Sequence, residues 1–230
     1  MAIKMYDLAG AELDRRFSPF CWRTKLALAH KGLEFETIPW RYADKPKIAF
    51  AGAERVPVIV DGERPVADSW KIAEYLEDHY PERPSLFGGA GGRGAARFVN
   101  SWADTVLNGA LSRLLVVDIL NHLEPGDRAY FRESREKRFG MTLEAFAADS
   151  ERHLGALRKA LEPLRVTLAG QPFIGGASPL YPDYIVFGSL QWARAIGRTR
   201  LLEADDPLEG WRGRLLDAFG GLARNAPGYW

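Results

Sequence analysis

The chain has 230 residues, of which 47% are hydrophobic and 27% are charged, as is usual for a soluble globular protein. Its formal net charge of +1 gives no electrostatic reason to expect a nucleic acid or an anionic membrane as a partner. Cys21 is the single cysteine, which excludes an internal disulfide and is compatible with a reducing cytoplasm, where we expect the protein to be located.

The first eighty residues predict the element order β-α-β-α-β-β-α. Ser18 suits the N-cap of a helix and Pro19 suits its first position, while the pair Lys31-Gly32 marks its end. A strand on each side of this helix predicts a parallel pair with a right-handed connection. Asp61-Gly62 predicts a hairpin turn. The expected elements are strands over 3–8, 33–39, 58–60 and 64–67, helices over 18–31 and 70–79, and a short helix near 46–50.

Residues 80–94 mark the clearest change in composition, because they are dense in proline and glycine and show no periodicity. We therefore expect an α/β domain over 1–82, a linker over 83–94 and an all-helical domain over 95–230. Beyond the linker no segment predicts a strand. The expected helices cover 95–123, 142–168 with an interruption at Pro163, 180–196 and 208–222, while 128–138 is compatible with a helix or an ordered loop.

Two roles are open for Ser18. As an N-cap it satisfies a free backbone N–H of the helix. A helix N-terminus also attracts anions through its N–H groups and its dipole. A hydroxyl at this point can donate a hydrogen bond to a bound thiolate and so lower the pKa of the thiol. The two roles are compatible.

Two further segments permit both a structural and a ligand-binding interpretation. Pro57 is either an ordinary proline at the start of a strand or a cis proline that exposes the backbone N–H and C=O of Val56 to a peptide ligand. Asp68 and Ser69 cap the next helix, where they can also hold an ammonium and a carboxylate, respectively. A free γ-glutamyl end carries these two groups side by side, so it is a suitable ligand.

Cys21 lies three residues after Ser18, as the resolving cysteine does in thioredoxin-like redox proteins. Because serine stands at the position of the reactive cysteine, thiol–disulfide chemistry is disfavoured and we expect Cys21 to be a packed thiol. The four histidines lie far apart and predict no metal site. The N-terminus lacks the apolar core of a signal peptide, and no apolar run approaches the roughly 20 residues of a membrane span.

Three segments in this order, followed by a linker and a helical half, resemble the glutathione transferase family over essentially the whole chain. They are SPFCWR at 18–23, RVP at 55–57 and DSWKIAEYL at 68–76. The segments most similar to the bacterial β-etherase-related branch, whose members include enzymes that cleave aryl ethers of lignin fragments with glutathione, are 22–28, 67–70 and 80–87. The resemblance implies a thioredoxin-like α/β N-terminal domain and an all-α C-terminal domain.

The resemblance also implies a glutathione site on the N-terminal domain. Ser18 would activate the thiol of glutathione. Val56 would pair with the cysteinyl backbone across a cis-Pro57. Asp68-Ser69 would hold the γ-glutamyl end, and Arg55 would face the glycyl carboxylate.

A hydrophobic electrophile would bind in the cleft between the two domains. Phe17 or Phe20 would line this cleft, together with Trp102 and Val106 from the first helix of the C-terminal domain. Dimerisation is usual in the family, so we expect a homodimer, with neither a nucleic acid nor a membrane as a partner.

The sequence departs from the family pattern in two places. Asp183 lies at the start of a C-terminal helix, but Leu180 stands where the family usually has serine or threonine, so we expect an incomplete capping box and weaker local stability. Pro19 and Phe20 replace the second serine and the cysteine of the related maleylacetoacetate isomerases, which disfavours isomerase activity.

The favoured hypothesis is a glutathione transferase, in which the thiolate of glutathione attacks a hydrophobic, aromatic electrophile, with cleavage of a β-aryl ether as one form of the reaction. The alternative is a non-catalytic protein of the same fold that carries hydrophobic ligands or binds a partner. A third hypothesis is a glutathione-dependent disulfide reductase that uses Cys21.

Overall fold

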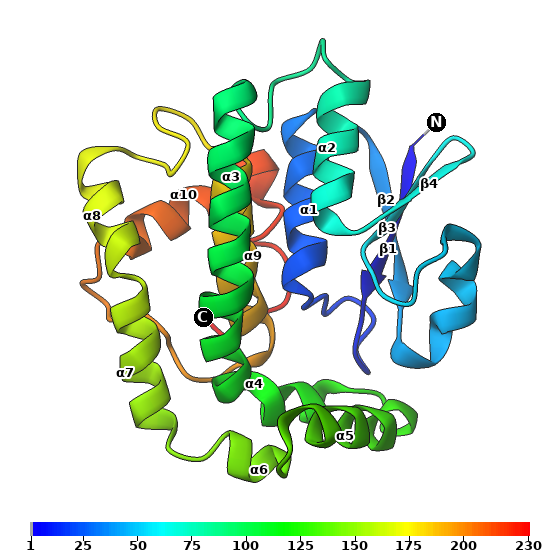
Figure 1. The fold of residues 1–230 in the computed structure, drawn as a ribbon, viewed down its shortest axis with the longest axis vertical. Helices are drawn as coiled ribbons and strands as arrows, with labels where there is room; N and C mark the ends of the chain where they lie inside the picture. Colours follow the sequence, from blue (N-terminus) through cyan, green and yellow to red (C-terminus); the bar gives the residue numbers. More distant parts are fainter. Residues whose placement is uncertain (1) are drawn as a thin grey trace.

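The N-terminal part of the chain forms one four-stranded sheet with the strand order β2-β1-β3-β4 (Figure 1). The structure is a computed structural model that describes residues 2–230. As predicted, β1 pairs in parallel with β2, whereas β3 is antiparallel to both β1 and β4. The strands are β1 (Ile3–Leu8), β2 (Phe35–Trp40), β3 (Val58–Asp61) and β4 (Arg64–Ala67).

Helix α1 lies between the sheet and the helical half of the molecule (Figure 1). It begins as the sequence predicts, since the Ser18 hydroxyl oxygen accepts the Cys21 N–H at 3.2 Å and Pro19 occupies the first turn. It ends at His30, just before Gly32, whose φ of +63° suits glycine. The helices of this part are α1 (Pro19–His30), the 3₁₀ helix η1 (Tyr42–Ala51) and α2 (Ser69–His79).

The remainder of the chain is helical, and the residues described after β4 form no further strand beyond an isolated bridge between Phe173 and Gly176. No helix within the described residues is long and apolar enough to cross a membrane. The helices are α3 (Ala90–Trp102), the π-helix η2 (Ala103–Leu107), α4 (Asn108–His122), α5 (Pro125–Phe139), α6 (Leu143–Phe146), α7 (Ser150–Ala160), α8 (Glu162–Gly170), α9 (Tyr181–Ile196) and α10 (Leu208–Gly221).

Two of the expected helices differ from the structure. The helix expected at 95 begins at Ala90, so the glycine-rich residues 90–94 belong to α3. Gly92 is required there, because a Cβ at this position would lie 1.8 Å from the carbonyl oxygen of Phe87. The helix expected over 142–168 is interrupted near Pro163, as predicted, where α7 ends and α8 begins. It is also divided between α6 and α7, where Asp149 has a φ of +62°. Residues 128–138, for which two interpretations were open, lie within α5.

Helix α9 joins the two halves of the molecule. All of its residues except Arg194 are buried, since it packs against α1, α3 and α4. The contact with α1 depends on Gly188, because a Cβ there would lie 2.6 Å from the carbonyl oxygen of Pro19. The start of α1, and Ser18 with it, is therefore fixed against the helical half.

Asp183 at the start of α9 accepts more hydrogen bonds than a capping box provides. Its carboxylate accepts the backbone N–H groups of Ile174, Gly175 and Leu180 at 2.7, 2.9 and 3.0 Å. It also accepts the indole N–H of Trp211 at 2.8 Å. Leu180 lacks the side-chain acceptor of a complete box, as predicted, but its carbonyl oxygen accepts the Asp183 N–H at 2.9 Å. The expectation of weak local structure was wrong, because these four donors hold the segment before α9 in place.

Candidate functional site

Two adjoining cavities lie at the N-termini of α1 and α2. The first, which we call the α2–α3 cavity, has a volume of about 770 Å³. The second, which we call the α1–α5 cavity, has a volume of about 530 Å³ and extends from the start of α1 to α4 and α5. Phe20 and Asp104 line both cavities, so the two spaces meet at these side chains.

Ser18 lies at the α1–α5 cavity with only 4% of its surface exposed. Its hydroxyl oxygen accepts the Cys21 N–H, and this bond uses a lone pair and leaves the hydroxyl proton free to donate. The free proton and the N-terminus of α1 both favour a negatively charged atom in front of Ser18.

The segment Arg55-Val56-Pro57 contributes to the same cavity. The Val56–Pro57 peptide bond is cis. Arg55 and Val56 line the cavity beside Ser18, Arg55 being exposed and Val56 half-buried. The paired residues of β3 begin at Val58, so Val56 lies just outside the sheet ladder.

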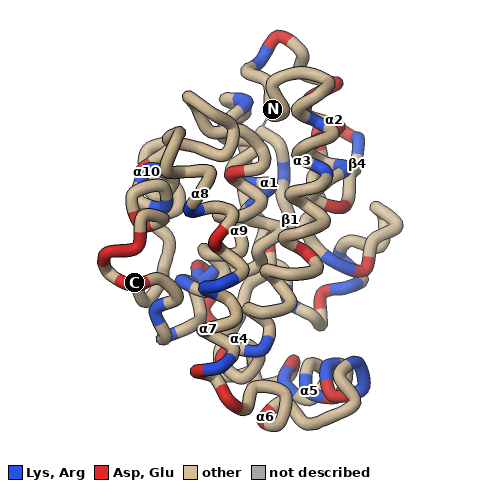
Figure 2. The backbone as a smooth tube through the Cα atoms, turned by 60° about the vertical axis from the view of Figure 1, so that its left-hand side comes forward, with Lys and Arg blue, Asp and Glu red and all other residues tan. Residues whose placement is uncertain are grey.

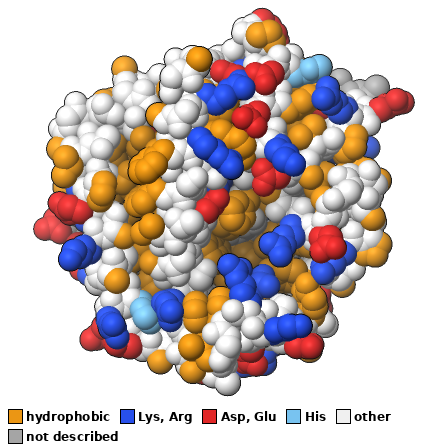
Figure 3. Space-filling model, in the orientation of Figure 1, with side chains coloured by type: hydrophobic (Ala, Val, Ile, Leu, Met, Phe, Trp, Pro, Cys, Tyr) orange, Lys and Arg blue, Asp and Glu red, His pale blue; other side chains and the backbone are white. Residues whose placement is uncertain are grey.

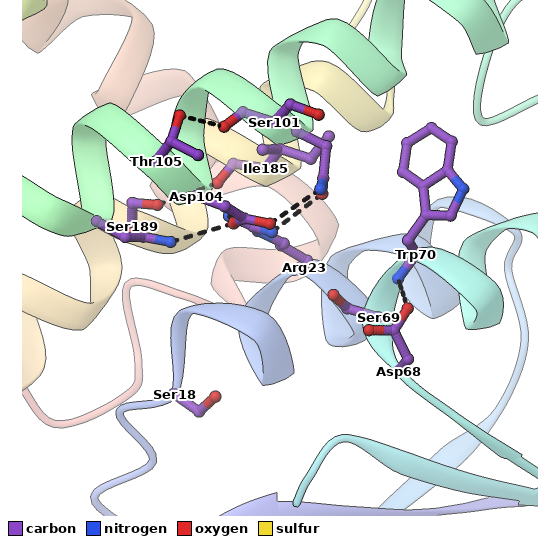
Figure 4. A network of polar contacts seen from close by, with 12 residues as sticks. Ser18, Arg23, Asp68, Ser69, Trp70, Ser101, Asp104, Thr105, Ile185 and Ser189 are labelled. Atoms are coloured by element: carbon purple, nitrogen blue, oxygen red, sulfur yellow. Dashed lines mark hydrogen bonds and ion pairs between the residues drawn. The ribbon is translucent and has the colours of Figure 1, made fainter. Parts of the chain in front are cut away.

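Asp68 and Ser69 line the α2–α3 cavity instead. One carboxylate oxygen of Asp68 accepts the N–H groups of both Trp70 and Lys71 at 3.0 Å, which leaves the second oxygen for a cation. Ser69 is 4% exposed, and its carbonyl oxygen accepts the Tyr181 hydroxyl at 2.8 Å. Figure 4 shows Asp68 and Ser69 at the start of α2 and Ser18 at the start of α1.

The phenylalanines predicted to line the electrophile pocket do line the α1–α5 cavity, but the two predicted helix residues do not. Trp102 packs against the core, and Val106 is 42% exposed outside both cavities. The cavity is lined instead by residues of η2 and α4 that recur every four positions along another face of this helical run, namely Asp104, Asn108, Ser112 and Val116.

A buried polar network that the sequence analysis missed lies between the two cavities (Figure 4). The guanidinium of Arg23 is fully buried and donates to the carboxylate of Asp104 at 2.8 Å and to the amide oxygen of Asn100 at 3.1 Å. The Asn100 amide donates in turn to Asp104 at 3.0 Å, and the Asn108 amide does so at 3.3 Å. A local signal for this network is an arginine in α1 with the apolar residues Pro19, Leu26 and Ala27 on the same side.

The cysteine of α1 has no access to either cavity. Cys21 is fully buried, and burial together with the nearby charge of Asp7 raises the pKa of its thiol far above the ordinary value. A buried, protonated thiol does not attack a disulfide. The structure therefore argues against the hypothesis of a disulfide reductase that uses Cys21.

The arrangement favours an anionic, peptide-like ligand. It offers a hydroxyl proton and a helix N-terminus at Ser18, an unpaired backbone at Val56, a free cation at Arg55 and a carboxylate oxygen at Asp68. Within residues 2–230 no three histidine, cysteine, aspartate or glutamate side chains are grouped so as to hold a metal ion.

Comparisons with known proteins agree with this fold. A probable glutathione S-transferase from rice (Oryza sativa subsp. indica) is 32% identical over 145 residues, which are 52% of this chain and 63% of the rice protein. The match thus spans less than two thirds of that relative. The solved structure of a glutathione transferase from Phanerochaete chrysosporium is 24% identical with a TM-score of 0.84, over 93% of this chain and 96% of the other.

A second solved structure is that of a glutathione S-transferase of Ceriporiopsis subvermispora in complex with glutathione. It is 26% identical with a TM-score of 0.76, over 95% of this chain and 98% of the other. The family model of the glutathione S-transferase N-terminal domain matches residues 17–79, and that of the C-terminal domain matches residues 95–220. The chain belongs to the glutathione S-transferase family.

Proposed function

We propose that the protein binds glutathione and transfers it to a hydrophobic electrophile. The observation that carries the proposal is the hydroxyl of Ser18, which lies at a helix N-terminus, keeps its proton free and borders a cavity shared with Val56. A relative crystallised with glutathione and the family match support the choice of ligand.

The two cavities offer a partner for each part of glutathione. The ammonium of its γ-glutamyl end suits the free carboxylate oxygen of Asp68, and the adjacent carboxylate suits the N-terminus of α2 at Ser69. The cysteinyl backbone suits Val56 as an added strand. The glycyl carboxylate suits the guanidinium of Arg55. This mode places the sulfur at Ser18, near the point where the cavities meet.

Ser18 promotes the reaction by favouring the thiolate, which is the nucleophile. Its O–H and the dipole of α1 stabilise the negative sulfur and so lower the pKa of the bound thiol. The thiol proton leaves to solvent. The sulfur then forms a bond to an electrophilic carbon of the second substrate, and the leaving group departs with its bonding electrons.

The α1–α5 cavity is suited to an aromatic electrophile, because Phe17, Phe20, Trp40 and Phe131 contribute to its lining. A β-aryl ether is one such substrate. It is supported by the resemblance of residues 22–28, 67–70 and 80–87 to the β-etherase-related branch. There the sulfur would form a bond to the β-carbon, the carbon–oxygen bond would break, and the phenolate would leave and take a proton from solvent.

Replacing Ser18 by alanine tests this proposal. With glutathione and 1-chloro-2,4-dinitrobenzene, we expect kcat to fall about 10- to 100-fold, by analogy with the loss of one oxyanion donor, while the Kd for glutathione changes little. Ultraviolet absorbance of the thiolate should show that the pKa of the bound glutathione thiol is higher in Ser18→Ala than in the unmodified protein. Ser18→Thr, which keeps a hydroxyl, should retain part of the activity that Ser18→Ala loses. Unchanged kcat and thiol pKa in Ser18→Ala would remove Ser18 from this role.

The alternative, a carrier of hydrophobic ligands, is separated by the same measurements on the unmodified protein. A carrier would bind glutathione or a hydrophobic ligand in calorimetry but conjugate no electrophile in a screen that includes aryl halides and a β-aryl ether model compound. Conjugation of any of these compounds above the uncatalysed rate favours the transferase.

A further inference from the structure

We propose that the electrophile is an aromatic carboxylate, and that Arg135 and Arg138 of α5 bind its carboxylate group. The proposal rests on the transfer function above and adds the chemical class of the second substrate. It follows from the charge and the geometry of the α1–α5 cavity along α5.

Helix α5 turns one face toward this cavity. The lining residues on α5 form two neighbouring rows with a spacing of four positions, which correspond to one side of a helix: Tyr130, Ser134 and Arg138, and Phe131, Arg135 and Phe139. The face therefore presents two guanidinium groups between two aromatic rings. The tube in Figure 2 marks acidic residues on α5 as well, but Glu133 and Glu136 are not among the residues that line the cavity.

The two arginines have no anionic partner among the residues that the structure describes. Within residues 2–230, no carboxylate lies within 4 Å of the guanidinium of Arg135 or Arg138. By contrast, Arg132 on another face of α5 pairs with Glu136 at 2.8 Å and with Glu144 at 2.7 Å. Acidic groups are thus within reach of this helix, yet they neutralise an arginine outside the cavity.

The partners that Arg135 and Arg138 do have are neutral. Arg135 donates to the Ser134 hydroxyl at 3.2 Å and lies 4.8 Å from the ring centre of Phe131. Arg138 lies 5.9 Å from the ring centre of Phe139. Contacts with aromatic faces orient a guanidinium but leave its charge uncompensated, so both groups remain available to a carboxylate.

The cavity as a whole has a surplus of positive charge. Its cationic lining residues are Lys45, Arg55, Arg135 and Arg138, and its acidic ones are Glu54 and Asp104. Asp104 is already bound to the buried Arg23. In the proposed binding mode, glutathione supplies one carboxylate to Arg55, and Lys45 donates to the Tyr130 hydroxyl at 2.8 Å. Lys45, Arg135 and Arg138 then stand against the single carboxylate of Glu54, so a cationic surplus remains for an anion of the second substrate.

An aromatic ring with a carboxylate matches both properties of the cavity. Figure 3 shows basic side chains around a hollow that is floored by hydrophobic ones. A ring between Phe17 and Phe20 would keep its reactive carbon near Ser18, while a guanidinium of α5 binds the carboxylate through paired N–H groups. The charged group would therefore orient the ring toward the thiolate.

The test uses two electrophiles that differ in charge, 1-chloro-2,4-dinitrobenzene and 4-chloro-3,5-dinitrobenzoate. In both, the glutathione sulfur bonds to the ring carbon that carries chlorine, the carbon–chlorine bond breaks, chloride leaves with the electron pair and the thiol proton goes to solvent. The variants are Arg135→Met, Arg138→Met and the double substitution. Lys137→Met is the matched control, because Lys137 lies on the same helix and carries the same charge but does not line the cavity.

We expect the double substitution to raise KM for the benzoate about tenfold, as the loss of a charge-assisted contact of roughly 1.4 kcal/mol predicts. In the double variant, KM and kcat for the neutral halide should stay within about twofold of their values in the unmodified protein. In Lys137→Met, KM and kcat for both electrophiles should stay within the same range. Added salt should weaken the preference of the unmodified protein for the benzoate. Equal effects of the double substitution on both electrophiles, or no effect on either, would overturn the proposal.

A binding measurement keeps this inference separate from the proposed function. Trp40 and Trp192 line the cavity, so their fluorescence should report the binding of 1-naphthoate and of the neutral 1-naphthamide. We expect the double substitution to weaken naphthoate binding about tenfold and naphthamide binding by less than about twofold. If the protein conjugates neither electrophile, the transfer function fails, and this measurement still decides whether the arginines select a carboxylate. Equal weakening for both naphthyl ligands would contradict the inference.

Discussion

At the scale of single residues, Asp104 is the side chain that connects the two cavities with the buried interior. It borders both cavities and is held by Arg23, Asn100 and Asn108. It lies in η2, and π-helical turns within long helices occur often at functional sites. Because the Arg23 guanidinium is fully buried, the Asp104 carboxylate is the group that compensates its charge.

Asp104→Asn should therefore destabilise the protein. The substitution leaves a buried guanidinium without a counter-charge, which lowers the free energy of unfolding by several kcal/mol in a closed interior. Because the Asp104 side chain is 35% exposed, we expect a smaller loss of about 2 kcal/mol. Urea unfolding followed by circular dichroism measures the loss. The double variant Arg23→Met, Asp104→Leu removes both charges and should recover much of it. A single variant as stable as the unmodified protein would show that the pair contributes nothing.

The residue scale also shows what the sequence can predict at the site. Ser18 and Asp68 act as helix caps, and capping depends on neighbours within three positions, so both were found from local pattern. Arg23 and Asp104 are about eighty positions apart, and their pairing depends on how α1 packs against η2. Trp102 and Val106 were wrong for the cavity lining, because hydrophobicity does not indicate which face of a buried helix borders a cavity.

At the scale of elements, α9 is the helix on which the position of the site depends. It supports the start of α1 through Gly188 and the start of α2 through Tyr181. Its own start depends on Asp183, which is fully buried and receives four hydrogen bonds. The position of the proposed glutathione site thus depends on a carboxylate that lines neither cavity.

Asp183→Ala should be among the most destabilising single substitutions in the chain. It leaves three backbone N–H groups and the indole of Trp211 without acceptors, and each buried unsatisfied donor costs about 1 kcal/mol or more, so we expect a loss of about 3–4 kcal/mol. The midpoint of urea unfolding measures it. Asp44→Ala is a comparison at a half-buried 3₁₀-helix start, where we expect a smaller loss. Similar losses in both variants would contradict the special role of Asp183.

The presence of a strand or helix was easier to predict from the sequence than the residues at which it begins and ends. Periodicity predicted every strand and most helices, because burial of one face imposes a regular pattern. The start of α3 was missed, because residues 90–94 include three glycines, which disfavour a helix. The close approach of Gly92 to the Phe87 carbonyl oxygen, which requires a glycine, is a tertiary contact that local pattern does not reveal. The interruption at Pro163 was predicted, but the break between α6 and α7 was missed, because the sequence near Asp149 contains no glycine or proline.

At the scale of the whole molecule, His30 joins the two halves at the end of α1. One ring nitrogen lies 2.6 Å from the Tyr184 hydroxyl of α9, and the other lies 3.0 Å from the carbonyl oxygen of Ser85 in the connection between the halves. The carbonyl can only accept, so the nitrogen facing it carries the proton and the other accepts from Tyr184. The neutral ring satisfies both partners, and burial lowers the pKa of His30.

The stability of the protein should therefore fall as the pH drops below about 6.5, the ordinary pKa of histidine. In this range the unfolded chain binds a proton at His30 that the folded chain does not bind. Wherever the unfolded state holds more protons than the folded state, the free energy of unfolding decreases as the pH falls. One such proton contributes at most about 1.4 kcal/mol per pH unit. The decrease ends below the lowered pKa of the folded state, where both states are protonated.

His30→Gln separates this contribution from those of the other titrating groups, because glutamine is neutral at every pH and offers both a donor and an acceptor. Urea unfolding at pH 8.0 and pH 5.5 gives four free energies of unfolding. We expect the variant to be less stable than the unmodified protein at pH 8.0, and the difference to narrow at pH 5.5, since only the unmodified protein loses the contribution of a neutral His30. A difference that is equal at the two pH values, or larger at pH 5.5, would show that the contact between the two halves does not depend on a neutral histidine.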